Sequence, residues 1–336
     1  MLTLTDYTRT IQPHIPPGVI SHEAFERVFT LTSHFPADLA NRIFDFEIYL
    51  GKNQSDLALH FAATSESRRQ LGQVSAFDDV AWEKIGRFSQ LWCESMSLVQ
   101  QHTDHVWLAF DLDQPVPEIP VPGFFYCAVS SQRQEDDPAS IIRFLASIFR
   151  DPAYIACLDD NLTRCLHSIP RHARINQVGF GLLRNHDAIR LQVIGITPQE
   201  IPAYLKAVGW AYSTAPLQSV IQHISSLDIV ALVIDVSASI YPKIGLECFL
   251  NRHDVRWQTL LDHLVKQGLC LPDKRDFLAP YPATKVCQLG EQLSLTRQGL
   301  SHIKISYHPE QTTTQLEAKA YLAHQPIWLS PIAHSA

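Results

Sequence analysis

Charged and aromatic side chains occupy every second position of several short segments, and such side chains can bind a ligand where they face one chamber. One segment carries Asp45, Glu47 and Tyr49, and a segment near the C-terminus carries Lys319 and Tyr321. Charges enclosed in a chamber must pair with one another or bind a ligand, because burying an unpaired charge is unfavourable by several kcal/mol. The alternation therefore predicts a ligand chamber with acidic, cationic and aromatic walls.

The other candidate residues follow the same alternation. In each segment the side chains of one parity are aliphatic or aromatic, and those of the other parity are mostly polar, charged or aromatic. Successive side chains of a strand point to opposite faces, so the second set is expected to line an interior and the first to meet helices. The further predicted lining residues are His60, Trp107, Asp111, Tyr126, Gln177, Arg190, Gln192, Asp235, Lys243, Glu247, Phe249, His302, Lys304 and Ser306. Small residues are expected to leave space for a ligand at Ala109, Gly179, Gly181 and Gly245.

Pairs of alternating segments, separated by segments with helical spacing, would position these side chains. The predicted hairpins are 42–50 with 56–62, 106–112 with 124–130, 177–183 with 188–196, 229–237 with 243–250, and 301–308 with 316–323. Helical spacing covers about 79–101, 138–149, 153–167, 198–208, 216–226 and a stretch that opens at Asp254. The repeated unit is a helix followed by a hairpin.

Short links between paired strands favour antiparallel pairing, because a parallel crossover needs about a dozen residues. A TIM barrel, which alternates single strands with helices, is the competing architecture. About ten twisted strands are expected to close, since closure removes both free edges. The prediction is one α+β domain over residues 1–336, with a closed ten-stranded antiparallel barrel and the helices outside. An open sheet with a solvated polar face is the alternative, although such a face would favour Lys, Glu and Thr over aromatic residues and glycine.

The bulk composition restricts the partners. Hydrophobic residues make up 46% of the chain and charged residues 18%, which favours a large core over disorder. A net charge of −7 argues against a nucleic-acid partner, because nucleic-acid affinity comes largely from clustered Lys and Arg. There is no apolar run of the roughly 18 to 20 residues that span a bilayer, and the first residues do not resemble a signal peptide. A cytoplasmic protein without a membrane partner is predicted.

Metal and cofactor motifs are missing from the sequence. The seven cysteines are odd in number and include no C-x-x-C pair, so buried thiols are predicted in place of disulfides or zinc ligands. There is no glycine-rich nucleotide loop, no H-E-x-x-H pair and no acidic D-D-x-x-D run of the metal-dependent prenyl synthases. Neither a metal nor a cofactor is predicted.

Helix and hairpin units that close into a ten-stranded antiparallel barrel resemble the prenyltransferase barrel, also called the ABBA fold, of aromatic and peptide prenyltransferases. The strand LEAKAYL, with Lys319 and Tyr321, resembles the Lys-x-Tyr strands that hold isoprenoid diphosphate in indole prenyltransferases. HIKISYH places Lys304 at a similar cationic position, and AIRLQVI supplies Arg190 and Gln192 in a similar alternation. The topological resemblance covers nearly the whole chain.

The resemblance implies a metal-independent prenyltransferase of natural-product biosynthesis, which moves an allylic isoprenoid from diphosphate to an aromatic or other nucleophilic acceptor, either a small molecule or a peptide. DFEIYL resembles the strand whose glutamate accepts the acceptor's proton, so Glu47 would be the catalytic base. Lysine, arginine and tyrosine groups would hold the diphosphate, and aromatic walls would shield the allylic cation. The implied substrate-binding residues are Arg190, Gln192, Lys243, Glu247, Lys304, Lys319, Tyr321, Tyr49, Trp107, Tyr126 and Phe249.

The early strands depart from this resemblance. They carry Asp45, Glu47, His60 and Asp111 where the family often places Arg and Lys. Acids on that wall could receive a basic acceptor, such as an amine, a guanidine or a peptide terminus. Two other functions stay open: a tailoring enzyme, hydrolase or cyclase on the same barrel that does not use diphosphate, and a non-catalytic carrier of an apolar ligand.

Overall fold

The structure is a computed structural model that describes most of the chain. The residues outside the description are 1–2, 37–38, 40–42, 53–56, 66, 75–76, 129–136, 183–187, 282, 290–291, 313–314 and 330–336. The turn expected in the third hairpin therefore lies outside the described residues.

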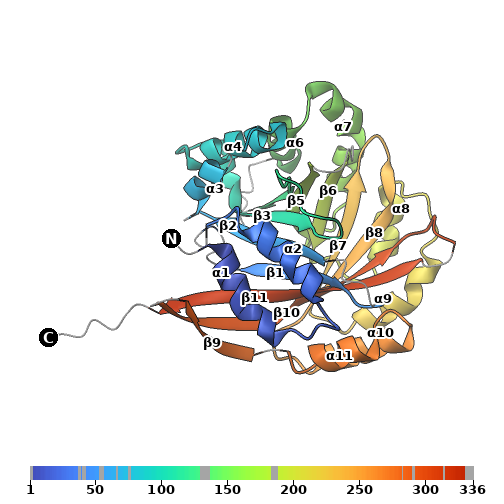
Figure 1. Cartoon of the computed structure of the whole chain (residues 1–336). Helices are drawn as coiled ribbons and strands as arrows, with labels where there is room; N and C mark the ends of the chain where they lie inside the picture. Colours follow the sequence, from blue (N-terminus) through green and yellow to red (C-terminus); the bar gives the residue numbers. More distant parts are fainter. Residues whose placement is uncertain are drawn as a thin grey trace.

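Ten antiparallel strands form a closed barrel (Figure 1). In sheet order they are β11 (Leu316–Leu329), β1 (Phe44–Tyr49), β2 (Leu57–Thr64), β3 (Thr103–Asp111), β4 (Gly123–Ala128), β5 (Arg174–Gly181), β6 (Ile189–Ile194), β7 (Ile229–Val236), β8 (Ile240–Phe249) and β10 (Gln292–Tyr307). Pairing between β10 and β11 closes the ring. The predicted barrel of five hairpins is confirmed, and the TIM barrel and the open sheet are excluded.

An eleventh strand, β9 (Ala283–Leu289), was missed by the sequence prediction. It pairs with the first half of β10, whereas β8 pairs with the second half. The register of β10 against β11 shifts between Leu300 and His302, which marks a bulge. A bulge lets a strand bend and change its twist, and here it separates the part of β10 beside β8 from the part that runs along β9 (Figure 1).

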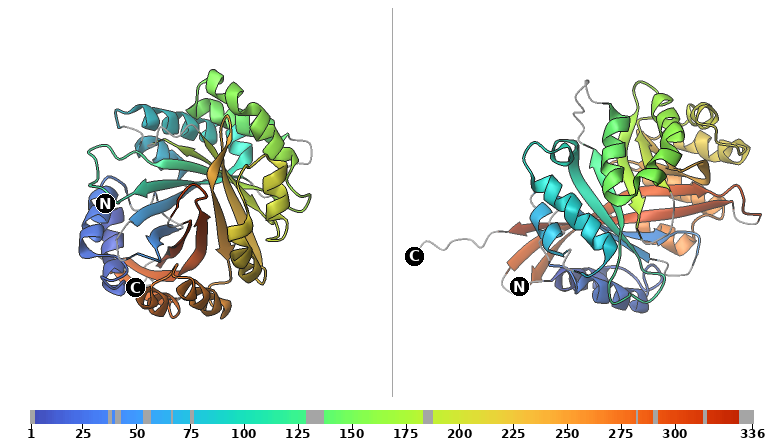
Figure 2. Two further views of the ribbon diagram at one scale, coloured as in Figure 1. Left: turned by 90° about the vertical axis from the view of Figure 1, so that its right-hand side faces the viewer. Right: turned by 90° about the horizontal axis from the view of Figure 1, so that it is seen from above.

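Helices surround the barrel on its outer side, as the left view of Figure 2 shows. They are α1 (Leu4–Ile11), α2 (His22–Thr32), α3 (Arg68–Val74), α4 (Val80–Cys93), α5 (Leu98–His102), α6 (Pro138–Phe149), α7 (Pro152–His167), α8 (Ile201–Ala207), α9 (Gln218–Ile224), α10 (Arg256–Lys266) and α11 (Pro272–Leu278). The sequence prediction missed α1, α2, α3 and α11, and it joined α4 and α5 into one helix. Asp79 begins α4 by accepting hydrogen bonds from the backbone amides of Ala81 and Trp82.

The hydrophobic core lies between the barrel wall and the helices. Phe46, Leu191, Leu246 and Ile305, which the alternation placed outward, are at most 1% exposed. Aromatic rings join the two layers: the ring centroid of Phe149 on α6 lies 4.8 Å from that of Phe124 and 4.7 Å from that of Phe180. Such a dry, closely packed layer fixes the strands from outside and leaves their other face to the lumen.

Cysteine burial differs in part from the prediction. Cys127, Cys165, Cys248 and Cys270 are buried free thiols, but Cys157 is exposed on α7. The α7 helix buries only one side, so a cysteine on its outer side meets solvent. Among the described residues, no helix has the length and apolar character needed to cross a membrane.

Candidate functional site

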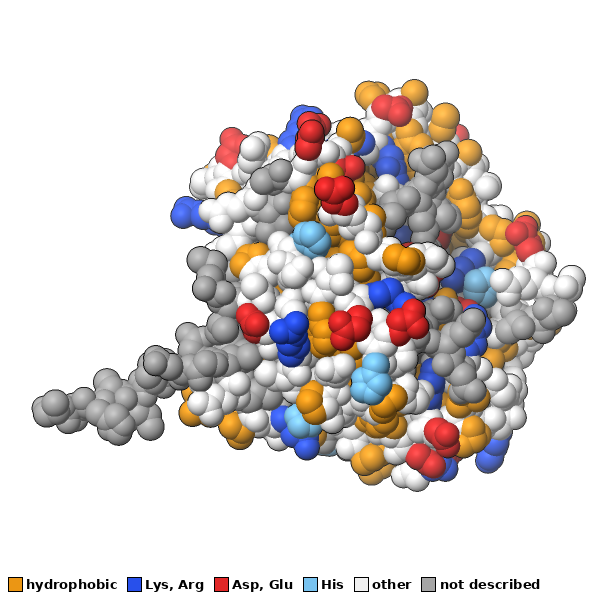
Figure 3. All heavy atoms as spheres, in the orientation of Figure 1, with side chains coloured by type: hydrophobic (Ala, Val, Ile, Leu, Met, Phe, Trp, Pro, Cys, Tyr) orange, Lys and Arg blue, Asp and Glu red, His pale blue; other side chains and the backbone are white. Residues whose placement is uncertain are grey.

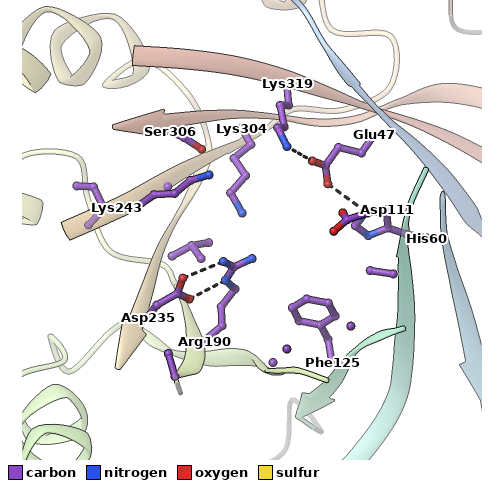
Figure 4. A pocket seen from close by; sticks show the side chains of 18 of the residues that line it. Glu47, His60, Asp111, Phe125, Arg190, Asp235, Lys243, Lys304, Ser306 and Lys319 are labelled. Carbon is purple, nitrogen blue, oxygen red and sulfur yellow. Dashed lines mark hydrogen bonds and ion pairs between the residues drawn. The ribbon is translucent and has the colours of Figure 1, made fainter. Parts of the chain in front are cut away.

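The barrel lumen contains a cavity lined by side chains from the strands around the ring (Figure 4). The lining includes ten of the polar or aromatic residues that alternation placed inward: Glu47, His60, Asp111, Arg190, Asp235, Lys243, Lys304, Ser306, Lys319 and Tyr321. It also includes the four predicted small residues, Ala109, Gly179, Gly181 and Gly245. Strand parity thus brings together residues that are up to 274 positions apart in the chain.

The first group of charges joins β1, β2 and β11. Lys319 Nζ donates a hydrogen bond to Glu47 Oε1 at 2.5 Å, and His60 Nε2 lies 3.0 Å from Glu47 Oε2. Burial raises the pKa of Glu47, but the attraction of Lys319 and His60 outweighs burial and holds that pKa well below its usual range. Glu47 is therefore an ionised carboxylate with two partners.

The second group lies on β6, β8 and β10. Lys304 Nζ donates to Glu247 Oε1 at 2.9 Å, and the amide of Gln192 donates to the other carboxylate oxygen. Asn176 in turn donates to the Gln192 side chain at 2.6 Å. Burial raises the pKa of Glu247, but Lys304 and His302 lower it overall to about 2. Glu247 and Gln192 do not border the described cavity; Glu247 contacts Lys304, and Gln192 contacts Glu247.

The third group is a two-point ion pair between neighbouring strands. Arg190 on β6 and Asp235 on β7 are register partners, and Arg190 donates from Nε at 2.7 Å and from Nη2 at 2.9 Å to the two carboxylate oxygens. Parallel N–H to oxygen bonds of this kind are among the stronger ion-pair geometries in proteins. Figure 4 shows the pair on the cavity wall below Lys304. A guanidinium that the sequence alone suggested for a ligand is thus already bound to a carboxylate.

Lys243 differs from the other cations of the cavity. The structure gives its ammonium group no hydrogen bond or ion pair with any described residue. Burial lowers the pKa of Lys243, and the positive charges of Lys319 and Lys304 lower it further, to about 8. The attraction of an arriving anion would raise the pKa of Lys243 again, so Lys243 is the cation most available to it.

Asp45, Phe249 and His302 do not border the described cavity. Asp45 is 4% exposed, its Oδ1 has no hydrogen-bond partner among the described residues, and burial raises its pKa to about 7 against the opposing effect of His60. His302 stacks between Phe249 and Tyr321, with ring centroids 4.9 Å and 3.8 Å away. The rings of His302 and Phe249 therefore pack behind Tyr321, which lines the cavity.

The aromatic wall differs from the predicted one at β4. Tyr126 is 2% exposed and belongs to the outer core, whereas its neighbour Phe125 lines the cavity. The placement of Tyr126 in the lumen was wrong because Phe124, Phe125 and Tyr126 are all aromatic, so alternation could not assign a face. The pairing of Ala109 with Gly123 would have revealed the correct parity.

Two glycines make room for cavity side chains. A Cβ atom on Gly179 would lie 2.3 Å from a ring carbon of Phe125, and one on Gly245 would lie 2.7 Å from Lys304 Cε. The Phe125 ring and the Lys304 stem therefore lie across bare backbone on the adjacent strands.

Two predicted aromatic residues stand beside the cavity. The ring of Tyr49 lies under Lys319 Nζ, 4.1 Å from its centroid, and Lys52 Nζ lies 4.5 Å from the same centroid. Trp107 is the register partner of Phe125 and shares its parity. Neither Tyr49 nor Trp107 borders the described cavity.

Solved structures resemble this arrangement. AnaPT from Neosartorya fischeri matches with a TM-score of 0.54 at 13% sequence identity, over 96% of this chain and 91% of that chain. The chain has the prenyltransferase-barrel fold. The 5-dimethylallyl tryptophan synthase from Streptomyces coelicolor, solved in complex with DMASPP and Trp, gives a TM-score of 0.44 at 10% identity, over 99% of this chain and 95% of that chain. No family model and no curated protein matches the sequence.

Three lysines of this prenyltransferase barrel come together in the lumen. On the face shown in Figure 3, acidic and basic side chains are interspersed over the part that the structure describes. In the lumen, by contrast, Lys243, Lys304 and Lys319 come from consecutive strands of the sheet, β8, β10 and β11. Among the described residues, no three His, Cys, Asp or Glu side chains gather in a metal-binding arrangement.

Proposed function

We propose that the chain is a prenyltransferase that moves an allylic isoprenoid from its diphosphate to an aromatic or other nucleophilic acceptor, either a small molecule or a peptide. The observation that carries the proposal is the convergence of cationic side chains on one cavity of a prenyltransferase barrel, where one of them contacts the carboxylate of Glu47. Lys243, Lys304 and Lys319 line one side, Arg190 lies below them, and Glu47 lies across from Lys243 (Figure 4). A carrier of an apolar ligand would need no such set of charges.

The lysines would bind the diphosphate and stabilise its departure. The allylic carbon–oxygen bond breaks with its electron pair going to the diphosphate, whose growing negative charge is met by ammonium groups and the Tyr321 hydroxyl. The allylic cation then forms a bond to the acceptor. Tyr321 and Phe125 are the aromatic lining residues available to shield that cation from water and stabilise it by cation–π contact.

Glu47 would take the proton that the acceptor loses. Its low pKa makes Glu47 a weak base, but much of that lowering comes from Lys319. When Lys319 turns to a bound diphosphate, its attraction for Glu47 is shared with the anion, and the pKa of Glu47 rises towards the range of a useful base. Donor binding and base activation are thereby coupled through one lysine.

Other predicted residues would hold the lining side chains in place. Glu247 holds Lys304, Gln192 holds Glu247, and the ring of Tyr49 lies against the ammonium group of Lys319. Phe249 would support Tyr321 through the stacked His302 ring. Tyr126 has no role in this proposal because it faces the helices.

Titration of the purified protein with dimethylallyl and geranyl diphosphate in EDTA, followed by calorimetry, tests the donor. Micromolar binding that is lost in Lys304→Ala and kept in Lys206→Ala, an exposed lysine on α8, supports the proposal. The second step is mass-spectrometric detection of the prenylated product from a mixture of aromatic and basic acceptors. If neither donor produces binding heat or a shift in melting temperature, the proposed prenyltransferase function is contradicted.

A diphosphate-independent tailoring enzyme on the same barrel is the second candidate. One observation favours it: Lys304, Lys319 and Arg190 already have carboxylate partners. A cavity that neutralises its own cations can serve a neutral or zwitterionic substrate. Binding of such a substrate without competition from inorganic pyrophosphate would support this candidate over prenyl transfer.

A further inference from the structure

The cavity contains as many carboxylates as cations. Its four cationic lining residues are Arg190, Lys243, Lys304 and Lys319. Its carboxylates are Glu47, Asp111 and Asp235 on the lining, and Glu247 in contact with Lys304. Leaving histidine aside, these charges cancel. A diphosphate that entered this cavity would have to compete with fixed carboxylates for every cation except Lys243.

Asp235 is the carboxylate that competes most directly. It is 7% exposed and engages Nε and Nη2 of Arg190 with two hydrogen bonds, from a register position directly opposite on the next strand. The other buried carboxylates contact lysines: Glu47 contacts Lys319, and Glu247 contacts Lys304 without bordering the cavity. Both Asp235 and Arg190 border the cavity, so an anion there meets the carboxylate and the guanidinium together.

We propose that Asp235 is a specificity-determining residue: it competes with the bound anion for Arg190 and so lowers the affinity of the cavity for diphosphates relative to less charged ligands. The inference takes its ligand from the proposed function, but it concerns anion binding and not the transfer step. Weakened anion binding has a use in a transfer enzyme, because the pyrophosphate product must leave before the next donor can enter.

The opposite role for Asp235 is orientation, in which it would hold Arg190 in place for the anion. The two roles predict opposite changes in anion affinity when the negative charge of Asp235 is removed. Removing a carboxylate several ångströms from a multiply charged anion is expected to raise affinity by on the order of 10- to 100-fold in a partly buried site. Loss of orientation alone is expected to lower affinity by on the order of tenfold, the usual effect of one hydrogen bond. The charge effect also grows with the charge of the ligand, whereas an orientation effect does not.

The test is calorimetry in EDTA with inorganic pyrophosphate and inorganic phosphate on Asp235→Asn. The variant is expected to bind pyrophosphate 10- to 100-fold more tightly than the parent, with a smaller gain for phosphate. Adding Arg190→Gln to Asp235→Asn is expected to remove most of the gain. Asp228→Asn is the matched control, because Asp228 makes a similar two-point pair with Arg256 on the surface. Asp235→Ser removes the same charge with a smaller side chain, for use where the asparagine variant does not fold.

Pyrophosphate binding by Asp235→Asn that is absent, unchanged or weaker than in the parent would overturn the inference. Equal increases in affinity for pyrophosphate and phosphate would contradict the claim that Asp235 discriminates between ligands by their charge. The proposed function can fail independently of this inference. Tighter pyrophosphate binding by Asp235→Asn, without prenyl transfer by the parent protein, would support the role of Asp235 and contradict the transferase function. Prenyl transfer by the parent protein, without tighter pyrophosphate binding by Asp235→Asn, would contradict only the role of Asp235.

Discussion

Lys319 and Glu47 lie on neighbouring antiparallel strands, and the ammonium group of Lys319 donates to the Glu47 carboxylate at 2.5 Å. The register offsets them: Glu47 is opposite Tyr321, and Lys319 is opposite Tyr49. The contact is thus diagonal and spans two residues along the strand, within reach of long side chains. It joins the proposed base to a proposed diphosphate contact, so a change at either residue alters the other.

Lys319→Ala is expected to weaken dimethylallyl diphosphate binding by about 1.5 to 3 kcal/mol, the usual worth of a charge-assisted hydrogen bond. It also leaves Glu47 buried without its cation, so the melting temperature is expected to fall, and adding Glu47→Gln is expected to restore part of it. Calorimetry and thermal melts measure the two effects. Unchanged donor affinity in the single variant would remove Lys319 from the anion site.

Glu47→Gln is expected to lower the rate of transfer by roughly 10² to 10⁴, because the amide keeps the shape of glutamate and has no basic carboxylate. Donor binding is expected to persist, since Lys319 is then released to the anion. Single-turnover product formation with a saturating donor is the measurement. Glu26→Gln, on the exposed side of α2, is the control. Full turnover by Glu47→Gln would show that another group accepts the proton.

Asp45 gives a prediction about stability and pH. Burial raises its pKa to about 7 in the folded protein, from a usual value near 3.8. The folded state therefore keeps the proton that the unfolded state releases, and stability is lost as pH rises from about 4 to 7. Asp45→Asn is expected to raise the free energy of unfolding at pH 8 by about 1 to 3 kcal/mol and to change it little at pH 4.

Urea unfolding at the two pH values checks the Asp45 prediction. The control is Asp113→Asn, at an exposed position between β3 and β4. Equal effects of Asp45→Asn at pH 4 and pH 8 would mean that the pKa of Asp45 is the same in the folded and the unfolded protein.

Gly179→Ala is expected to push the Phe125 ring out of its place, because the new methyl would lie 2.3 Å from a ring carbon. Overpacking of this kind destabilises proteins by about 1 to 3 kcal/mol. Combining it with Phe125→Leu is expected to recover part of the loss, which a double-mutant cycle by urea unfolding would detect. Gly18→Ala, where no atom lies within 4 Å of the new methyl, is the control. If the two substitutions lower the free energy of unfolding additively, the methyl group of Gly179→Ala does not clash with the Phe125 ring.

Several parts of the site could be predicted because strand parity is a local property. The sequence DFEIY puts Asp45, Glu47 and Tyr49 on one face wherever the strand lies, and LEAKAYL does the same for Lys319 and Tyr321. Five hairpins with short links leave antiparallel closure as the simplest way to remove free edges. The prediction failed for GFFYCA, where both faces of the strand carry aromatic residues, and it missed α1 and α2, the helices that precede the first hairpin.

The sequence by itself determined that a closed antiparallel barrel would form and, in strands whose two faces differ in polarity, which side chains would face its lumen. The tertiary structure alone decided which carboxylate meets which cation. Arg190 and Asp235 are 45 residues apart and Glu47 and Lys319 are 272 apart, and each pair meets only because strand register fixes their relative heights. Register is set by packing and hydrogen bonding over the whole closed sheet, which no single segment encodes. For the same reason the sequence named Arg190 as a ligand contact, whereas the folded barrel binds it to Asp235.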